Sequence, residues 1–252
     1  MAYLGINVVR IGEFSWGVVE KRPGQIDFTL LDEAIEALYS EGIRIIMGTP
    51  TAAPPSWLLK KYPGVLRMDG DRRTPVAAGR RQYCFNSPRY RIETERIVSA
   101  YVDHYGKDHR IIAWQADNEY GCHGSTLCYC RNCAGAFREW LRERYGTLDN
   151  LNQSWGTVFW SHTYGDWEEI NPPKPGPVSP NPSLVLDYRR FSSDSAIEYH
   201  DIHKEIIKKS SKAPLTHNLM VNFTDIDYRK LARKIDFVSW DNYVAGEYDP
   251  DL

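Results

Sequence analysis

Short runs of β-forming residues alternate with helical segments along this chain, and this alternation constrains the fold more than any other feature. Five such runs occur, at residues 7–11, 44–49, 111–115, 214–219 and 236–240. Strands that alternate with helices predict a parallel sheet with crossover helices. No glycine-rich phosphate loop follows any of the runs, which disfavours a nucleotide-binding open sheet.

Apolar residues recur at helical spacing between these runs. Three helices are predicted around residues 31–38, 97–102 and 137–145, and a longer one from about 186 to 209. A glycine follows each of the first three, at positions 42, 106 and 146. The segment 160–182 is rich in proline and aromatic residues, and we expect it to be a loop that folds over the top of a barrel.

Polar residues crowd the ends of the predicted strands: Glu13, Thr49, Asn118, Glu119, His217, Asn218, Asp241 and Asn242. A (β/α)8 barrel builds its active site at the C-terminal ends of its strands. The sequence therefore predicts one α/β domain over residues 1–252, an incomplete TIM barrel with about five of eight strands. The remaining strands are expected outside the chain, before Met1 and after Leu252.

Composition excludes some classes of function. The formal net charge is −2, which argues against nucleic-acid binding because phosphate neutralisation needs a basic surface. No apolar run approaches the roughly 18 residues of a membrane span, and no signal peptide opens the chain. The expected location is the cytoplasm.

Residues 114–121 (WQADNEYG) are the most informative segment. An apolar strand delivers Asp117, Asn118 and Glu119 in succession. Glycosidic cleavage requires a carboxylic acid that protonates the leaving oxygen and later activates water, and Glu119 could fill that role beside a second carboxylate. An isolated Asn-Glu pair is more often a solvated strand end, so its position after a buried strand favours the catalytic interpretation.

The cysteines form the second motif. Four of the five fall within residues 122–133, and such a cluster suggests metal binding rather than disulfides. Cys128, Cys130 and Cys133 with the distant Cys84 would make a closed tetrahedral zinc site. Buried free thiols or a disulfide are the alternatives, and His123 could replace one thiolate.

Several long segments together resemble the family 42 glycoside hydrolases, a group of retaining β-galactosidases. They are residues 7–16 (NVVRIGEFSW), 48–57 (GTPTAAPPSW), 80–88 (RRQYCFNSP), 114–121, the cysteine cluster and 239–243 (SWDNY). The resemblance runs from about residue 5 to the end of the chain. It implies a complete TIM barrel and a β-galactoside substrate, and relatives of this kind are often homotrimers.

The resemblance also implies roles for individual residues. Glu119 matches the family's general acid/base, Asn118 its sugar-binding asparagine, and Arg80 a sugar-binding arginine four residues before the first zinc ligand. Trp160 resembles a loop tryptophan that walls the sugar site. The four positions Cys84, Cys128, Cys130 and Cys133 match the family's structural zinc ligands, and Cys122 is left as a free thiol.

The family's nucleophile is a glutamate at the end of the seventh strand, and no residue of this chain matches it. We expect it beyond Leu252, so this chain alone should be inactive, and Glu119 should titrate lower without that neighbour. Other retaining barrel glycosidases, acting on β-glucosides, β-xylosides or α-L-arabinosides, and a non-catalytic carbohydrate-binding remnant are the competing functions.

Some polar and aromatic residues near strand ends stay open. Glu13 and Trp16 could shape the cleft or simply close the barrel top. His217 and Asn218 could face the sugar or support the strand end.

Overall fold

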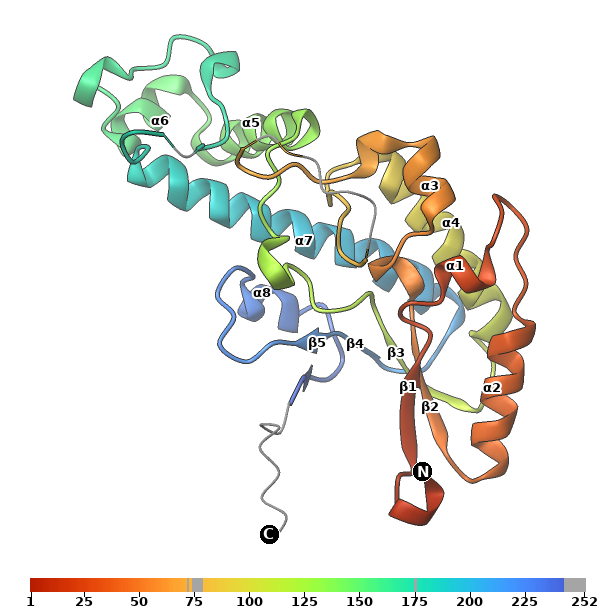
Figure 1. The fold of residues 1–252 in the computed structure, drawn as a ribbon. Coiled ribbons are helices and arrows are strands. Elements are labelled where there is room, and N and C mark those ends of the chain that lie inside the picture. The colour runs from red at the N-terminus through yellow and green to blue at the C-terminus, as the bar shows by residue number, and fades with distance from the viewer. Residues whose placement is uncertain (72, 74–78, 175, 243–252) are drawn as a thin grey trace, which may run out of the picture.

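The computed structural model describes residues 1–71, 73, 79–174 and 176–242. Strands β1 (Val8–Ile11), β2 (Arg44–Gly48), β3 (Ile111–Gln115) and β4 (Leu215–Thr216) form one parallel sheet in this order, and β5 (Asn218–Leu219) pairs in parallel with β6 (Ser239–Trp240). Within each sheet, a strand therefore pairs with the strand that follows it in the sequence, as in a barrel (Figure 1).

One predicted strand, 214–219, is divided at His217. Thr216 pairs with Gln115 of β3, whereas Asn218 pairs with Ser239 of β6. His217 between them is buried and stacks on the Tyr120 ring, with centroids 4.0 Å apart. Residues 215–219 thus pair with β3 at one end and with β6 at the other. The five predicted runs therefore occupy five consecutive strand positions. The described strands do not close into a barrel, which agrees with the prediction of a partial one.

The predicted helices are present between the strands. They are α2 (Thr29–Ser40), α4 (Pro88–Tyr105), α5 (Arg131–Tyr145) and α7 (Pro182–Ser210). Capping residues define where two of them begin: the Ser87 hydroxyl accepts from the Tyr90 amide, and the Asn181 side chain accepts from the amides of Ser183 and Leu184. In both cases a proline occupies the first helical position.

Shorter helices were not predicted from the sequence. They are α1 (Trp16–Val19), α3 (Ser56–Lys61), α6 (Leu148–Trp155) and α8 (Tyr228–Ala232). None of the helices in the described part of the chain combines the length and apolar character needed to cross a bilayer.

The buried side chains form two clusters. The sheet cluster lies between the strands and α2, α4 and the C-terminal half of α7, and includes Ile45, Met47, Tyr101, Trp114 and Leu215. The cysteine-centred cluster is built from α5, α6 and the N-terminal half of α7, around the four buried cysteines 84, 128, 130 and 133. Helix α7 is long enough to join both clusters (Figure 1).

The described part of the predicted loop 160–182 contacts α5 and α6. Tyr164 and Trp167 pack against the cysteine-centred cluster. Arg138 of α5 donates to the Ile170 carbonyl at 2.8 Å, and Asn152 of α6 donates to the Tyr164 carbonyl at 2.8 Å. These anchors draw the described part of the loop towards the helices.

Candidate active site

The turn after β3 has an unusual backbone. Asp117 and Glu119 have φ angles of 49° and 46°, in the left-handed region that non-glycine residues rarely adopt. Hydrogen bonds from neighbouring strand ends hold this conformation. The Asp117 amide donates to Thr49 Oγ1 at 2.7 Å, and the Glu119 amide donates to Asn218 Oδ1 at 3.0 Å. Thr49, which follows β2, and Asn218, which begins β5, thus fix the backbone position of Glu119.

Gly121 ends the turn, and no larger residue would fit there. Its φ is 81°, and an added Cβ would lie 2.1 Å from Thr126 Oγ1 and 3.0 Å from the Phe223 ring. The chain must therefore pass close to residues 126 and 223 immediately after the catalytic candidate.

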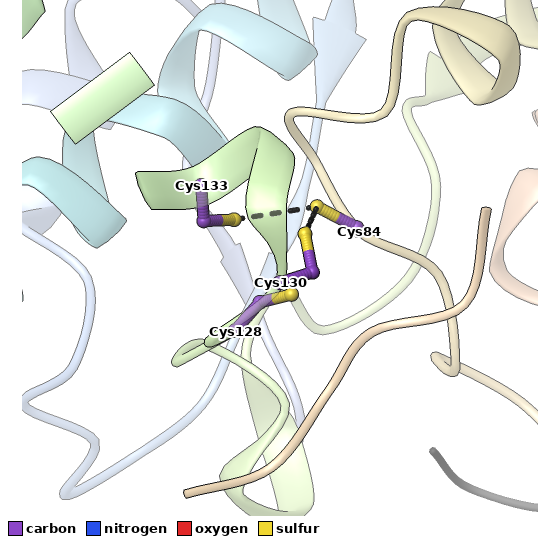
Figure 2. Close-up of side chains that lie close together, drawn as sticks. All are labelled: Cys84, Cys128, Cys130 and Cys133. Atoms are coloured by element: carbon purple, nitrogen blue, oxygen red, sulfur yellow. Dashed lines mark hydrogen bonds between the residues drawn. The ribbon is translucent and has the colours of Figure 1, made fainter. Parts of the chain in front are cut away.

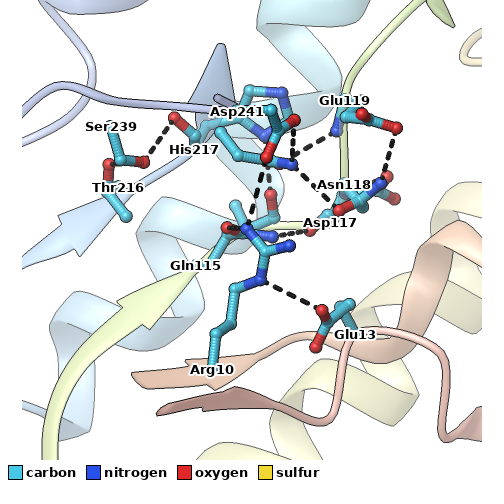
Figure 3. Close-up of polar contacts among 12 residues, drawn as sticks. Arg10, Glu13, Gln115, Asp117, Asn118, Glu119, Thr216, His217, Ser239 and Asp241 are labelled. Atoms are coloured by element: carbon cyan, nitrogen blue, oxygen red, sulfur yellow. Dashed lines mark hydrogen bonds and ion pairs between the residues drawn. The ribbon is translucent and has the colours of Figure 1, made fainter. Parts of the chain in front are cut away.

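The Glu119 carboxylate is buried among donors. Its residue is only 4% exposed. Arg81 Nη1 donates to its Oε2 and also to the Glu119 carbonyl at 3.1 Å. Arg80 Nη1 lies 3.5 Å from the same Oε2. Asn118 Nδ2 donates to this oxygen at 3.1 Å, as Figure 3 shows. Two guanidinium groups and one amide thus surround a single carboxylate.

These donors determine its ionisation. Burial opposes the charged form of Glu119, but the hydrogen bond from Arg81, a hydrogen bond with Asp241 and the nearby Arg80 charge outweigh it and lower the pKa of Glu119. For Asp241, burial and the contact with Glu119 prevail and raise the pKa.

Asp241 is the second carboxyl group of this network. Asn218 Nδ2 donates to both Asn118 Oδ1 at 3.0 Å and Asp241 Oδ2 at 2.9 Å. Arg10 connects Asp241, 3.9 Å away, to Glu13, whose Oε1 accepts from Arg10 Nε at 3.0 Å (Figure 3). Asp241 therefore belongs to the network that holds the turn of Glu119, because Asn218 hydrogen-bonds Asn118, Asp241 and the Glu119 amide.

Glu119 lines a cavity of about 640 Å³, which is large enough for a sugar-sized ligand. The lining residues are Arg80, Glu119, Cys122, His123, Met220, Val221, Asp241 and Asn242. The residues that follow β2, β3, β5 and β6 all contribute to it, as expected for a barrel site at the strand ends.

Asp117 has a different role from Glu119, two residues away. It is fully buried, and its Oδ2 accepts from Thr51 Oγ1 at 2.5 Å and from the Tyr83 hydroxyl at 2.7 Å. Burial raises the pKa of Asp117 to about 6. Asp117 does not line the cavity, and it ties the turn to residues 51 and 83.

The structure brings Arg80, Asn118 and Glu119 together but leaves Trp160 apart. Trp160 is 61% exposed, stacks on Phe159 and does not line the Glu119 cavity. Arg81 makes the closest contact with Glu119 but was not predicted from the sequence. The only available signal was the Arg80-Arg81 pair, because sequence alone does not say which of two adjacent side chains turns inward.

The residues left open by the sequence have structural roles. His217 is buried and donates its Nδ1 hydrogen to the Ala116 carbonyl at 2.8 Å, so it does not face the cavity. Trp16 is fully buried and donates to Glu20 Oε2 at 2.8 Å. Asn218 joins the network around Glu119, and Glu13 is the buried partner of Arg10.

The four cysteines form a candidate metal centre (Figure 2). The sulfur atoms of Cys84, Cys128, Cys130 and Cys133 all lie within 4.8 Å of one another. Cys84 Sγ is 3.6 Å from Cys130 Sγ and 3.3 Å from Cys133 Sγ. Zinc–sulfur bonds of about 2.3 Å in a tetrahedron place sulfurs about 3.8 Å apart, so the donor set fits a closed four-thiolate site.

Further donors surround this centre. The Met68 amide donates to Cys128 Sγ and Asn86 Nδ2 donates to Cys133 Sγ, each at 3.4 Å. Such N–H groups stabilise thiolates and orient metal ligands. The centre joins the connection after β2, which carries Cys84, to the start of α5.

Cys122 and His123 lie outside this group of four. Cys122 Sγ is 3.0 Å from His123 Nδ1, and both residues line the cavity beside Glu119. Cys122 is a free thiol, as the sequence suggested.

Comparison with known proteins decides the family. The family described as β-galactosidase, glycoside hydrolase family 42, matches residues 1–251. The chain belongs to this family. Among curated family 42 relatives, β-galactosidase BgaA of a Thermus species is 45% identical over 250 residues, 99% of this chain and 39% of BgaA. BgaH of Haloferax lucentense is 47% identical over 98% of this chain and 37% of its own length.

Solved structures agree with this family 42 assignment. The β-galactosidase from Halorubrum lacusprofundi superimposes with a TM-score of 0.94 at 44% identity, over 99% of this chain and 38% of that one. The enzyme from Marinomonas ef1 gives 0.92 at 41% identity, over 95% and 37%. These comparisons confirm the TIM-barrel class, and this chain spans less than two fifths of the length of these relatives.

Proposed function

We propose that the longer protein carrying this chain is a retaining β-galactosidase in which Glu119 is the general acid/base. The observation that carries the proposal is a buried carboxylate at a strand end, held by Arg80, Arg81 and Asn118 and open to a sugar-sized cavity. Its support is the family membership and the names of the relatives.

The surroundings of Glu119 suit one half of a double displacement particularly well. Deglycosylation needs an ionised carboxylate that takes a proton from water, and Arg81 favours that form. The first half-reaction needs the acid form, which the negative charge of a nearby nucleophile would favour. Asn118 would hydrogen-bond the sugar 2-hydroxyl, and Arg80, 41% exposed at its side chain, would bind further hydroxyls.

The nucleophile is proposed to be a glutamate beyond Leu252 in the longer protein. Asp241 is not proposed for this role, because it belongs to the hydrogen-bond network that supports the turn of Glu119. The 252-residue chain alone should therefore not turn over a β-galactoside.

Zinc is the proposed occupant of the four-cysteine centre. Four sulfur donors at these separations suit its tetrahedral preference and leave no position open for water, so the ion would stabilise the fold. Reduced thiols of this kind also fit the proposed cytoplasmic location.

Trp160 does not line the Glu119 cavity of its own chain. We therefore propose that it contacts a sugar bound to another copy of the chain. Val158, Phe159 and Trp160 are 82%, 67% and 61% exposed, and a contact between copies would cover this apolar group. This arrangement would agree with a homotrimer of the full-length protein.

The test uses the full-length protein with 4-nitrophenyl glycosides. The β-galactoside should be cleaved faster than the β-glucoside, β-xyloside and α-L-arabinoside, and Glu119→Gln should lower its kcat by roughly 10²–10⁴-fold. Glu198→Gln, a change at a carboxylate whose side chain is 61% exposed, is the matched control and should retain activity. A faster rate with another glycoside would reject the substrate assignment, and an unaffected Glu119→Gln variant would reject the catalytic one.

A further inference from the structure

A second cavity, of about 350 Å³, opens beside the Glu119 cavity. Its walls include Arg67, Arg80, Arg81, Cys122, His123 and Ser125. Arg80, Cys122 and His123 line both cavities. The two spaces are therefore neighbouring compartments with a shared wall, and we name the smaller one the arginine pocket.

The charges around the arginine pocket are unbalanced. Three guanidinium groups line it, and no carboxylate among the described residues does. Arg80 and Arg81 share the single Glu119 carboxylate. Arg67 donates to the Leu127 carbonyl at 3.4 Å, an uncharged partner. The pocket thus carries more positive charge than Glu119 neutralises.

Arg81 is a buried arginine with one unpaired nitrogen. It is 5% exposed, and its Nη1 makes both contacts with Glu119. Its Nη2 is buried without a hydrogen-bond partner. A buried charged donor with no acceptor is costly, and such a group in a native protein calls for a specific explanation. Nη2 is closed off in the empty pocket, so a ligand oxygen would become its acceptor after the Arg81 side chain shifts towards the pocket that it lines.

We infer that the arginine pocket binds a carboxylate carried by the aglycone of the substrate. Guanidinium groups recognise carboxylates through paired N–H donors, which gives both charge and geometric complementarity. This inference rests on the proposed function. The general acid contacts the leaving-group oxygen, and the Glu119 cavity would hold the galactose. The neighbouring arginine pocket would then receive the aglycone, which lies beyond that oxygen. The substrate class is an acidic β-galactoside.

Lactobionate and lactitol form a matched pair for the test. Both carry a β-galactosyl group on a six-carbon polyol chain, and they differ in having a carboxylate or a hydroxymethyl group at one end. With the full-length protein at low salt, kcat/KM should be about tenfold higher for lactobionate, the effect of one charged hydrogen bond. The preference should shrink as salt is added, because screening weakens exposed charge pairs.

Two arginine variants locate the effect. Arg67→Gln should lower kcat/KM for lactobionate about tenfold more than for lactitol. Arg73→Gln removes a nearby arginine whose side chain is 75% exposed and should leave both values unchanged. A preference that survives Arg67→Gln would overturn the assignment of the pocket.

The controls separate this inference from the function on which it rests. Equal kcat/KM for lactobionate and lactitol would overturn the inference while the β-galactosidase stands. Failure to cleave either compound or 4-nitrophenyl β-galactoside would overturn both.

Discussion

The sheet cluster and the cysteine-centred cluster are held together in different ways. In the sheet cluster, large side chains pack directly, as in the stacked rings of Tyr83 and Tyr90 with centroids 4.3 Å apart. In the cysteine-centred cluster, four sulfur atoms converge where apolar side chains would otherwise meet. Burial of apolar surface stabilises the first region, whereas in our proposal a zinc ion bound by the four sulfurs stabilises the second.

The candidate active site lies where these regions meet. Tyr83 donates to Asp117 in the turn that carries Glu119, and the next residue, Cys84, belongs to the candidate metal centre. Arg80 and Arg81 precede both. The segment that sets the ionisation of Glu119 is therefore anchored in both clusters, and a change in the cysteine-centred cluster should reach the site through it.

The largest expected effect comes from breaking the metal centre. Cys130→Ser in the full-length protein should abolish zinc binding and lower the free energy of unfolding by more than about 4 kcal/mol, the range associated with loss of a structural metal. Zinc content and denaturant unfolding measure this. Cys122→Ser is the matched control, because Cys122 lies outside the group of four.

Proteolysis would show where the damage occurs. Cleavage of Cys130→Ser should begin in residues 131–182, which build or pack on the cysteine-centred cluster. Equal zinc content and stability in the Cys130→Ser and Cys122→Ser proteins would contradict the contrast between the two regions.

The sheet cluster should instead be sensitive to acid. Burial lowers the pKa of His200 to about 4 and that of His217 to about 3, and it lowers the pKa of His203 well below its usual range. The folded state thus binds fewer protons than the unfolded state below about pH 6.5. Stability is present above that pH and is lost as the pH falls towards 4, by about 1.4 kcal/mol per pH unit for each histidine.

His203→Phe tests this acid sensitivity. His203 Nδ1 lies in hydrogen-bond contact with Thr49 Oγ1 at 2.9 Å, and its Nε2 is buried without a partner. The variant should reduce the slope of unfolding free energy against pH by about 1.4 kcal/mol per unit between pH 6 and 4. Unfolding in denaturant across that range gives the slope, and an unchanged slope would show that His203 does not oppose protonation.

A smaller effect should follow from Arg81→Gln, which alters the segment anchored in both clusters. Removing the guanidinium should raise the pKa of Glu119, because Arg81 favours the charged carboxylate. The alkaline limb of the kcat/KM profile reports the free general acid, so it should move to higher pH. Arg73→Gln should leave it in place, and a limb that stays fixed in Arg81→Gln would mean that Arg81 does not control Glu119.

Periodicity and strand order were predictable from the sequence, whereas side-chain choices at the site were not. The strands at 44–48 and 111–115 match the prediction closely, because buried apolar runs leave few alternatives. The division at His217 depends on pairing with two different neighbours, and the placement of 160–182 depends on anchors such as Arg138. Both are tertiary interactions that local patterns do not contain.

The candidate site shows the same division. Glu119, Asn118 and Arg80 were found by motif and position. Arg81, whose side chain is buried against Glu119, has a backbone φ of 60°. Asn218 connects Asp241 to the Glu119 amide. Neither contact follows from sequence spacing.

The most direct test of the role of Glu119 is the product formed by Glu119→Ala in the full-length protein with azide. Lactose cleavage should be lost, while 2,4-dinitrophenyl β-galactoside, whose leaving group needs no protonation, should still form the galactosyl-enzyme. Azide should then release that intermediate as β-galactosyl azide, because a small anion can enter the space left by the carboxylate. Formation of α-galactosyl azide would identify Glu119 as the nucleophile, and undiminished lactose cleavage would exclude it from the chemistry.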